Sequence, residues 1–128
     1  MTIAYCCLLI AGLLPYIAVG FAKSGGGYDN ARPRESMATF GGRQARAVAA
    51  HANSFEAFPF FAAVVLLAGV THADPQWING LAVGFILARS VYIIAYLTDR
   101  PLLRSIVWMI GIACVLAIGV QAISAGTV

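Results

Sequence analysis

Four long apolar stretches, separated by shorter polar segments, dominate the pattern of this chain. In chain order they cover residues 2–22, 45–70, 78–97 and 105–125. Each contains about the 20 residues that a helix needs to span the hydrocarbon core of a bilayer. The stretches are continuously apolar and do not alternate with period two, so helices are favoured over the strands of a barrel. The pattern predicts an all-α integral membrane protein, one bundle of four transmembrane helices.

Composition indicates that lipid is the main solvent of the chain. Of the 128 residues, 61% are hydrophobic and 10% are charged, and the mean hydropathy is +0.86. A soluble domain of this length has too little interior to bury so much apolar surface. We therefore expect membrane lipids as neighbours, and no nucleic-acid partner, because no sizeable soluble part remains to bind one.

Basic residues concentrate in the first and third connections between the apolar stretches. They are Lys23, Arg32, Arg34, Arg43, Arg46, Arg100 and Arg104. The second connection, 71–77, has neither lysine nor arginine. Since basic loops stay on the cytoplasmic side, this predicts both termini outside and a cytoplasmic loop at 23–42. With no retrieval motif at 126–128, we expect a bacterial inner membrane.

That first connection has the composition of a loop. It contains three consecutive glycines, Asn30 and Pro33, which indicate little helical tendency. A connection of this length in so small a bundle is either a functional, partner-facing loop or a flexible tether.

The second apolar stretch carries polar residues that are costly at membrane depth. Each ionisable group there costs about 2.5–3.5 kcal/mol on insertion scales, so such groups normally mark a site or a buried pair. At about 100° per residue, four polar residues fall on one helix face. They are Arg43, Arg46, Asn53 and Glu56. His51 lies off that face.

The third apolar stretch carries a second polar stripe, in which Arg89, Tyr92 and Tyr96 fall within about 60° of one another. Counted from the cytoplasmic side at about 1.5 Å per residue, Glu56 lies roughly 14 Å deep and Arg89 roughly 12 Å deep. An acid and a base at matched depth on neighbouring helices compensate each other's cost in lipid. We therefore predict that Glu56 and Arg89 face each other inside the bundle.

Two interpretations of this pair stay open. The pair can simply determine helix packing, with Asn53 as a hydrogen bond between helices. Alternatively, the surplus of cations on the cytoplasmic rim favours a pocket for an anionic ligand, because one glutamate cannot neutralise them all. Arginines would hold carboxylates and Glu56 an ammonium group, as suits a small zwitterion such as glutathione. No metal site is expected, because His51 and His72 lie on different segments.

Two motifs resemble the membrane-associated proteins in eicosanoid and glutathione metabolism, a family that includes the microsomal glutathione transferases. The first motif is Arg46-Ala47 followed by His51-x-Asn53-x-x-Glu56-x-x-Pro59-x-Phe61. The second is Arg89-x-x-Tyr92-x-x-x-Tyr96 followed by Arg104. The likeness covers nearly the whole chain, as four spans with matching loop polarity.

The resemblance implies a homotrimer of four-helix bundles that binds glutathione between neighbouring subunits, near the cytoplasmic side. The glutathione-binding residues expected from it are Arg46, Asn53, Glu56, Arg89, Tyr92 and Tyr96. Arg104 is the expected catalytic residue, which stabilises the glutathione thiolate with help from the hydroxyl of Tyr96. His51 would lie at the subunit contact.

The implied activity is glutathione-dependent transfer to lipophilic electrophiles or reduction of lipid hydroperoxides, and an isomerase stays open. Relatives carry an arginine two or three residues before the histidine position, where this chain has Val48 and Ala49. The position after Glu56 is also small, Ala57. The missing carboxylate clamp motivates the alternative, a non-catalytic accessory or lipid-binding membrane subunit with the same fold.

Overall fold

The computed structural model describes residues 1–126, and these residues form helices and connections without strands. The helices are α1 (Thr2–Lys23), α2 (Pro33–Ala38), α3 (Gly42–Val70), α4 (Pro75–Leu97) and α5 (Pro101–Gly126). All except the short α2 are long and apolar enough to cross a membrane. The predicted all-α fold with four membrane-spanning helices is therefore confirmed for the described part of the chain.

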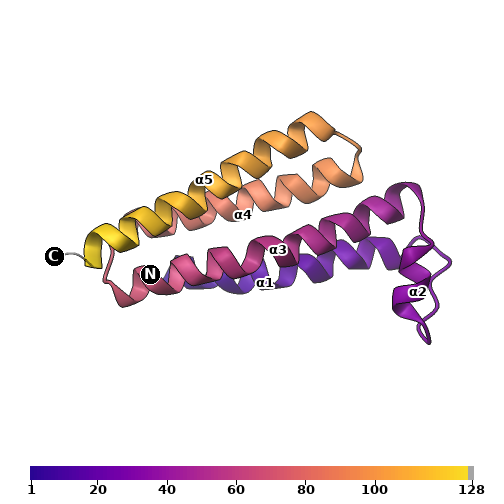
Figure 1. The fold of residues 1–128 in the computed structure, drawn as a ribbon, viewed down its shortest axis with the longest axis horizontal. Helices are drawn as coiled ribbons and strands as arrows, with labels where there is room; N and C mark the ends of the chain where they lie inside the picture. The colour runs from indigo at the N-terminus through magenta and orange to yellow at the C-terminus, as the bar shows by residue number, and fades with distance from the viewer. Residues whose placement is uncertain (127–128) are drawn as a thin grey trace.

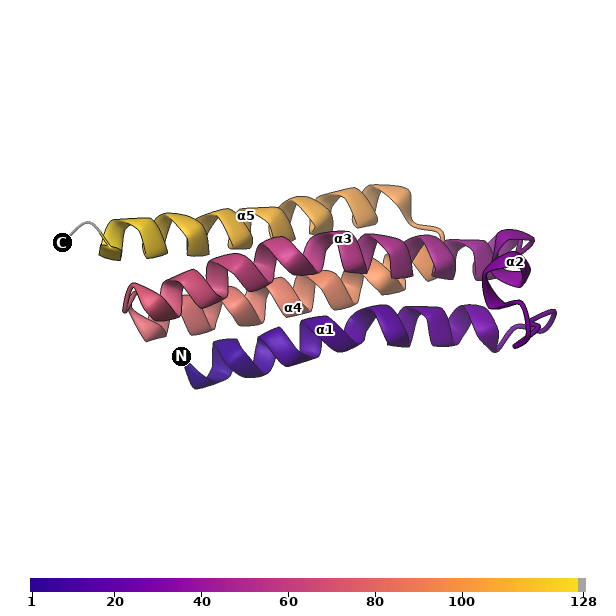
Figure 2. The ribbon, with the colours of Figure 1, turned by 60° about the horizontal axis from the view of Figure 1, so that its bottom comes forward.

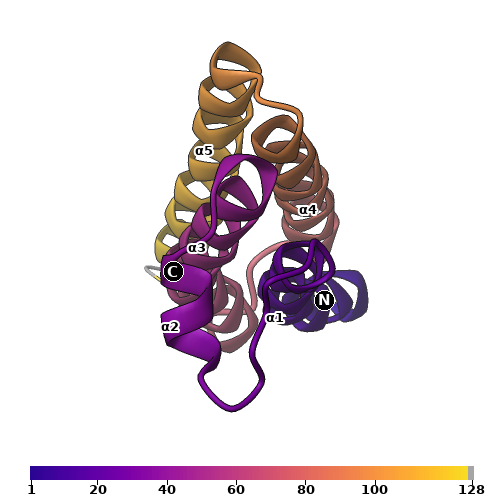
Figure 3. The same ribbon diagram turned by 90° about the vertical axis from the view of Figure 1, so that its right-hand side faces the viewer.

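The four long helices run alternately up and down along a common axis (Figure 1). The start of α1, the end of α5 and the α3–α4 connection lie at one end of the bundle (Figure 2). The two connections rich in basic residues lie at the other end, where α2 is also found. Viewed from the α2 end, the helices surround a shared interior (Figure 3). The closest partners are α1 with α3 and α4 with α5.

Local capping determines where α4 begins and ends. The Asp74 carboxylate accepts a hydrogen bond from the Gln76 amide at 2.9 Å, and Pro75 occupies the first turn, where no N–H is needed. At the other end Asp99 adopts a positive φ of 56°. The Arg100 amide then donates to the Ala95 carbonyl at 2.8 Å and closes the last turn. The tight turn after it leads directly into α5.

The first connection differs from its prediction, because residues Pro33–Ala38 form the helix α2. The expectation of little helical tendency is wrong for this segment. Pro33, which we interpreted as a loop residue, occupies the first helical turn, where its missing N–H costs nothing. The Ser36 hydroxyl donates to the Arg32 carbonyl at 2.9 Å and accepts from the Asp29 amide at 3.0 Å, which ties α2 to the preceding turn.

Two clusters of buried apolar residues fill the interior. The large cluster, near the chain ends, draws on all four long helices, and its rings Phe61 and Phe85 stack with centroids 4.0 Å apart. The small cluster, near α2, consists of Leu14, Ala18, Ala22, Ala47, Ala50, Ile93 and Leu97. Ser54 and Arg89 are the buried polar side chains of the described residues. Along both α3 and α4 they fall between the two clusters, so a polar layer separates them.

Candidate functional site

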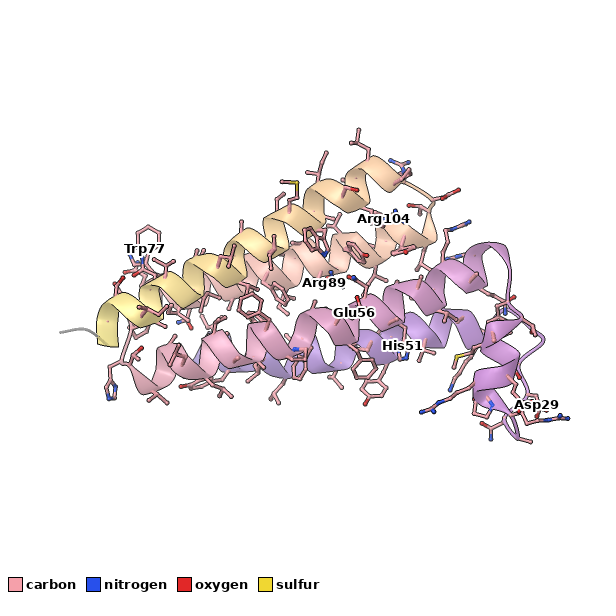
Figure 4. The ribbon with its side chains drawn as sticks, in the orientation of Figure 1. Asp29, His51, Glu56, Trp77, Arg89 and Arg104 are labelled. Atoms are coloured by element: carbon pink, nitrogen blue, oxygen red, sulfur yellow. The ribbon has the colours of Figure 1, made fainter. Side chains whose placement is uncertain are left out.

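A cavity of about 180 Å³ lies between α3, α4 and α5 at the level of this polar layer. We call it the Glu56 cavity. Its polar lining comes from Asn53, Glu56 and Arg89, and the rest of its wall is apolar. Figure 4 shows Glu56 on α3 and Arg89 on α4, both in the space where these helices face each other. An apolar pocket with a few convergent polar groups is typical of a small-molecule site.

Glu56 and Arg89 share this cavity but do not form the direct ion pair that we predicted. No salt bridge joins them in the part of the chain that the structure describes. Glu56 lies at the exposed edge of α3, where the Asn53 Nδ2 donates to its carboxylate at 3.1 Å. Arg89 is only 3% exposed and donates from Nη2 to the Ser54 hydroxyl at 3.4 Å. The two charges therefore attract each other across the cavity rather than in contact.

Asn53 leaves one polar atom without a partner. Its Oδ1 is buried and accepts no hydrogen bond, while its Nδ2 is engaged by Glu56. A buried acceptor left unpaired costs about 1–3 kcal/mol. The exposed Glu56 carboxylate is the acceptor that a ligand in this cavity can reach, and it suits a hydrogen-bond donor such as an ammonium or amide group.

A stack of two aromatic rings, with a cation at each end, runs along α4 and reaches α5. The Arg89 guanidinium lies 4.2 Å from the centroid of the Tyr92 ring, and the Tyr92 and Tyr96 rings meet edge to face at 5.5 Å. The Arg104 guanidinium of α5 lies 4.3 Å from the Tyr96 centroid. The stripe on α4 thus aligns three of these residues, and the tight α4–α5 turn brings Arg104 back to the same face.

A second cavity of about 350 Å³ lies beside this stack, and we call it the Arg104 cavity. It is lined by Tyr92, Arg104, Ser105, Trp108 and Met109. Trp108 lines both cavities and separates them. Arg104 forms no salt bridge with any described residue, so its charge is free to bind an anion.

The structure does not bring Arg46 to this site. Its Nη2 donates to the Leu97 carbonyl at 3.5 Å, and its Nη1 lies 3.9 Å from the Asp99 carboxylate. A cation at this position compensates the partial negative charge at the C-terminus of α4. Arg43, from the same predicted face, lies over the Phe21 ring of α1 at 6.0 Å. The polar residues of the second span therefore have three different surroundings. Arg46 binds the end of α4, Arg43 lies against α1, and Asn53 and Glu56 line the Glu56 cavity.

The model of the MAPEG family matches residues 3–124 of the chain. The chain belongs to the MAPEG family. This confirms the family that the two motifs indicated, and it identifies an integral membrane protein linked to glutathione or eicosanoid metabolism. No match is found among the curated proteins or among the solved structures.

His51, which belongs to the first MAPEG-like motif, lies on the other side of α3. Its Nδ1 is 2.7 Å from the Pro15 carbonyl of α1, and its ring meets Phe55 edge to face at 5.1 Å. Figure 4 shows it pointing away from Glu56. In this MAPEG chain the histidine therefore contacts α1 and does not line either cavity.

Sequence reasoning did not assign Ser54, Trp108 or Gly111 to the site, and it noted Ala57 only as a small residue after Glu56. Ser54 binds Arg89, and Trp108 divides the two cavities. Trp108 follows Arg104 by one helical turn, so its position on the same face was visible in the sequence. Ala57 and Gly111 line the Glu56 cavity. The sequence does not indicate that a small residue lines a cavity, because this depends on how closely the neighbouring helix packs against it.

Proposed function

We propose that this MAPEG protein is a glutathione-dependent enzyme that transfers glutathione to lipophilic electrophiles or uses it to reduce lipid hydroperoxides. One observation carries the proposal: acceptors gather in the Glu56 cavity and an uncompensated cation in the Arg104 cavity, on the two sides of Trp108. The Glu56 carboxylate suits an ammonium group. A zwitterion that also carries a thiol, such as glutathione, fits this division of charge.

Arg104 is the group to which we assign stabilisation of the thiolate. A free cysteine thiol has a pKa of about 8.5, and a neighbouring cation favours the reactive thiolate. Stacking on Tyr96 occupies the face of the guanidinium and leaves its N–H edge available to the sulfur. We assign the Tyr96 hydroxyl as the second hydrogen-bond donor to the thiolate. Tyr92 lines the Arg104 cavity and Arg89 lines the Glu56 cavity, so we assign both to glutathione binding.

The chemistry follows from the thiolate as nucleophile. With an electrophile, its sulfur forms a bond to carbon, and the leaving group departs with its electron pair. With a hydroperoxide, the sulfur attacks the terminal oxygen, the O–O bond breaks, and the alkoxide takes a proton to become an alcohol. A second glutathione then converts the sulfenic acid to the disulfide and water.

We further infer that the enzyme is a homotrimer with glutathione between neighbouring subunits. Glu56 is exposed on α3 at membrane depth, beside the exposed rings of Phe55 and Phe60. A carboxylate facing lipid is costly, which favours a second copy of the chain covering this face. The family resemblance supports three copies.

The proposed orientation places the α2 end in the cytoplasm and both chain ends outside, in a bacterial inner membrane. The support is that both connections with basic residues lie at the α2 end (Figure 1). Such residues stay on the cytoplasmic side during insertion.

A second candidate function is a non-catalytic accessory or lipid-binding subunit. It is favoured by Val48 and Ala49, which stand where relatives carry arginine, and by the engagement of Arg46 with Leu97 and Asp99. Without a carboxylate clamp, the cavities would hold lipid and activate no thiol. This candidate predicts co-purification with a larger complex and no affinity for glutathione.

Ultraviolet absorbance in the thiolate band, recorded as glutathione is added to the purified protein, tests the enzyme against the accessory subunit. The enzyme predicts a thiolate signal that Arg104→Ala removes. Arg100→Ala is the matched control, since Arg100 is exposed in the preceding turn and lines neither cavity. A missing thiolate signal, with glutathione-dependent turnover unchanged by Arg104→Ala, would exclude the proposed role of Arg104.

A further inference from the structure

A further cavity, of about 510 Å³, lies at the α2 end of the bundle, where α1 ends and α3 begins. We call it the Arg43 cavity. It is lined by Phe21, Ser24, Gly25, Gly41, Arg43 and Gln44. None of these residues lines the Glu56 cavity or the Arg104 cavity. A ligand bound here would therefore not belong to the proposed glutathione site.

Hydrogen bonds between distant segments hold the wall of the Arg43 cavity in place. The Gln44 Nε2 of α3 donates to the Ala22 carbonyl at 2.9 Å and to the Gly26 carbonyl at 2.8 Å. A Cβ at Gly25 would lie 2.6 Å from the Gln44 Cδ, so glycine lets this side chain pack directly against the backbone. The end of α1 and the start of α3 are thus tied together, and the cavity is formed before a ligand binds.

The charge of Arg43 is not compensated within the described part of the chain. Arg43 forms no ion pair with a described residue, whereas Arg32 in the same connection lies near the carboxylates of both Asp29 and Glu35. The Arg43 guanidinium is 6.0 Å from the centroid of the Phe21 ring, at the outer limit of a cation–π contact. Its N–H groups therefore remain available to an anion.

The Arg43 cavity lies at the depth of the lipid headgroups. The 22 residues of α1 rise about 33 Å, close to the thickness of about 30 Å of a hydrocarbon core. Phe21, two residues before the end of α1 at Lys23, is 45% exposed. An exposed ring at the edge of the acyl chains, beside a free cation among the headgroups, suits a ligand with one apolar part and one anionic part.

We propose that the Arg43 cavity binds the headgroup of an anionic phospholipid, with its phosphate against Arg43 and its glycerol and first methylene groups against Phe21. A soluble phosphate compound would use Arg43 alone, and one exposed ion pair contributes little. A lipid also buries apolar surface on the Phe21 ring, which favours it. The described lining contains no carboxylate to receive the ammonium group of a zwitterionic lipid. The site needs no glutathione and does not depend on the proposed function.

Native mass spectrometry of the full chain in detergent micelles tests this site by counting bound lipids. Dioleoyl phosphatidylglycerol should bind about fivefold more tightly than dioleoyl phosphatidylcholine, because one cation at the membrane surface accounts for a factor of this size. Arg43→Gln should remove the preference. Arg34→Gln is the matched control, because Arg34 is exposed on α2, forms no ion pair with a described residue and does not line the cavity. It should change the affinity by less than about twofold.

Three results would overturn the proposal. Equal affinity of the parent protein for the two lipids would remove the preference for an anion. Equal losses in Arg43→Gln and Arg34→Gln would indicate a diffuse effect of surface charge and no specific pocket. Glycerol phosphate, which lacks acyl chains, should not displace phosphatidylglycerol when added at the same concentration. Displacement would assign the cavity to a soluble phosphate compound and exclude the lipid.

Gly41 provides a second test that keeps Arg43 in place. Its backbone is extended, with φ −121° and ψ 172°, and a Cβ there would meet open space. Gly41→Asp should fold, because aspartate is favoured at the N-cap position of a helix. Its carboxylate should repel the phosphate and weaken phosphatidylglycerol binding about fivefold. Gly41→Asn has nearly the same shape without the charge and should bind more tightly than Gly41→Asp. Equal affinity of these two variants for phosphatidylglycerol would contradict the site.

Discussion

The two ends of the bundle are packed in different ways. Near the chain ends, the large cluster joins side chains of all four long helices around the stacked Phe61 and Phe85. Near α2, the small cluster joins α1, α3 and α4 and contains mainly alanine. None of the buried residues of this cluster belongs to α5. Figure 1 shows that toward that end α5 lies farther from α1 and α3 than α4 does.

This difference explains where a site can form. Alanine lets helix backbones approach closely, so α1, α3 and α4 hold together near α2 without help from α5. The first turns of α5 are then free to place Arg104 and Trp108 beside α4. Arg89 and Arg104 at this level lie against tyrosine rings and also line the two cavities. The end with the large cluster supplies stability, and the end near α2, which we call the divergent end, leaves room for a ligand.

The largest effect is expected from disrupting the large cluster. Phe61→Ala removes a fully buried ring and its stack on Phe85, which leaves a cavity and should cost about 3 kcal/mol in the free energy of unfolding. Unfolding monitored by circular dichroism in nanodiscs measures it. Phe60→Ala, the exposed neighbour, should cost less than about 1 kcal/mol. Equal losses would contradict the assignment of stability to this cluster.

At the divergent end, we expect Arg104→Ala to act on chemistry instead of stability. Loss of the cation should lower glutathione-dependent turnover about 10²-fold, the usual size for one electrostatic donor. The free energy of unfolding should fall by no more than about 1 kcal/mol, because Arg104 has no carboxylate partner among the described residues and loses only its contact with the Tyr96 ring. Arg104→Lys keeps the charge and should retain part of the activity. A large drop in stability with unchanged turnover would reverse our interpretation.

A smaller effect is expected where α1 meets α3. The Gln44 Nε2 donates to the Ala22 carbonyl at 2.9 Å and to the Gly26 carbonyl at 2.8 Å. Gln44→Ala should cost about 1–2 kcal/mol and speed tryptic cleavage after Lys23. Limited proteolysis measures this, with Gln121→Ala, exposed on α5, as the control. Unchanged cleavage would show that these bonds do not hold the connection.

The smallest effect on stability is expected at the polar layer between the clusters. Arg89→Leu should change the free energy of unfolding by less than about 1 kcal/mol, because losing the contacts of a buried cation is offset by losing its desolvation cost. Ser54 stays satisfied, since its hydroxyl donates to the Ala50 carbonyl at 2.8 Å. Ser54→Ala should cost more, because it leaves the buried guanidinium without its acceptor. The reverse order would favour a packing role for Arg89.

Much of the fold was predictable because its determinants are local. The length of each apolar stretch identified the membrane-spanning helices, and the spacing of Arg89, Tyr92 and Tyr96 placed them on one face. The separation of Glu56 from Arg89 was not predictable. Their matched depth was inferred from the rise along each helix, but depth contains no information on the lateral distance between helices. Glu56 lies at the edge of α3 and Arg89 inside, so a cavity separates them.

The sequence by itself determined that lipid surrounds this protein, how many helices are able to cross the membrane, and which residues of each helix share a face. Apolar length and helical periodicity suffice for these, since both depend on neighbours along the chain. Only the tertiary structure decided that Arg46 binds the end of α4, that Asn53 keeps an unpaired acceptor, and that Gly111 leaves a cavity beside it. These outcomes depend on how closely segments distant in the chain approach one another, which no local pattern encodes.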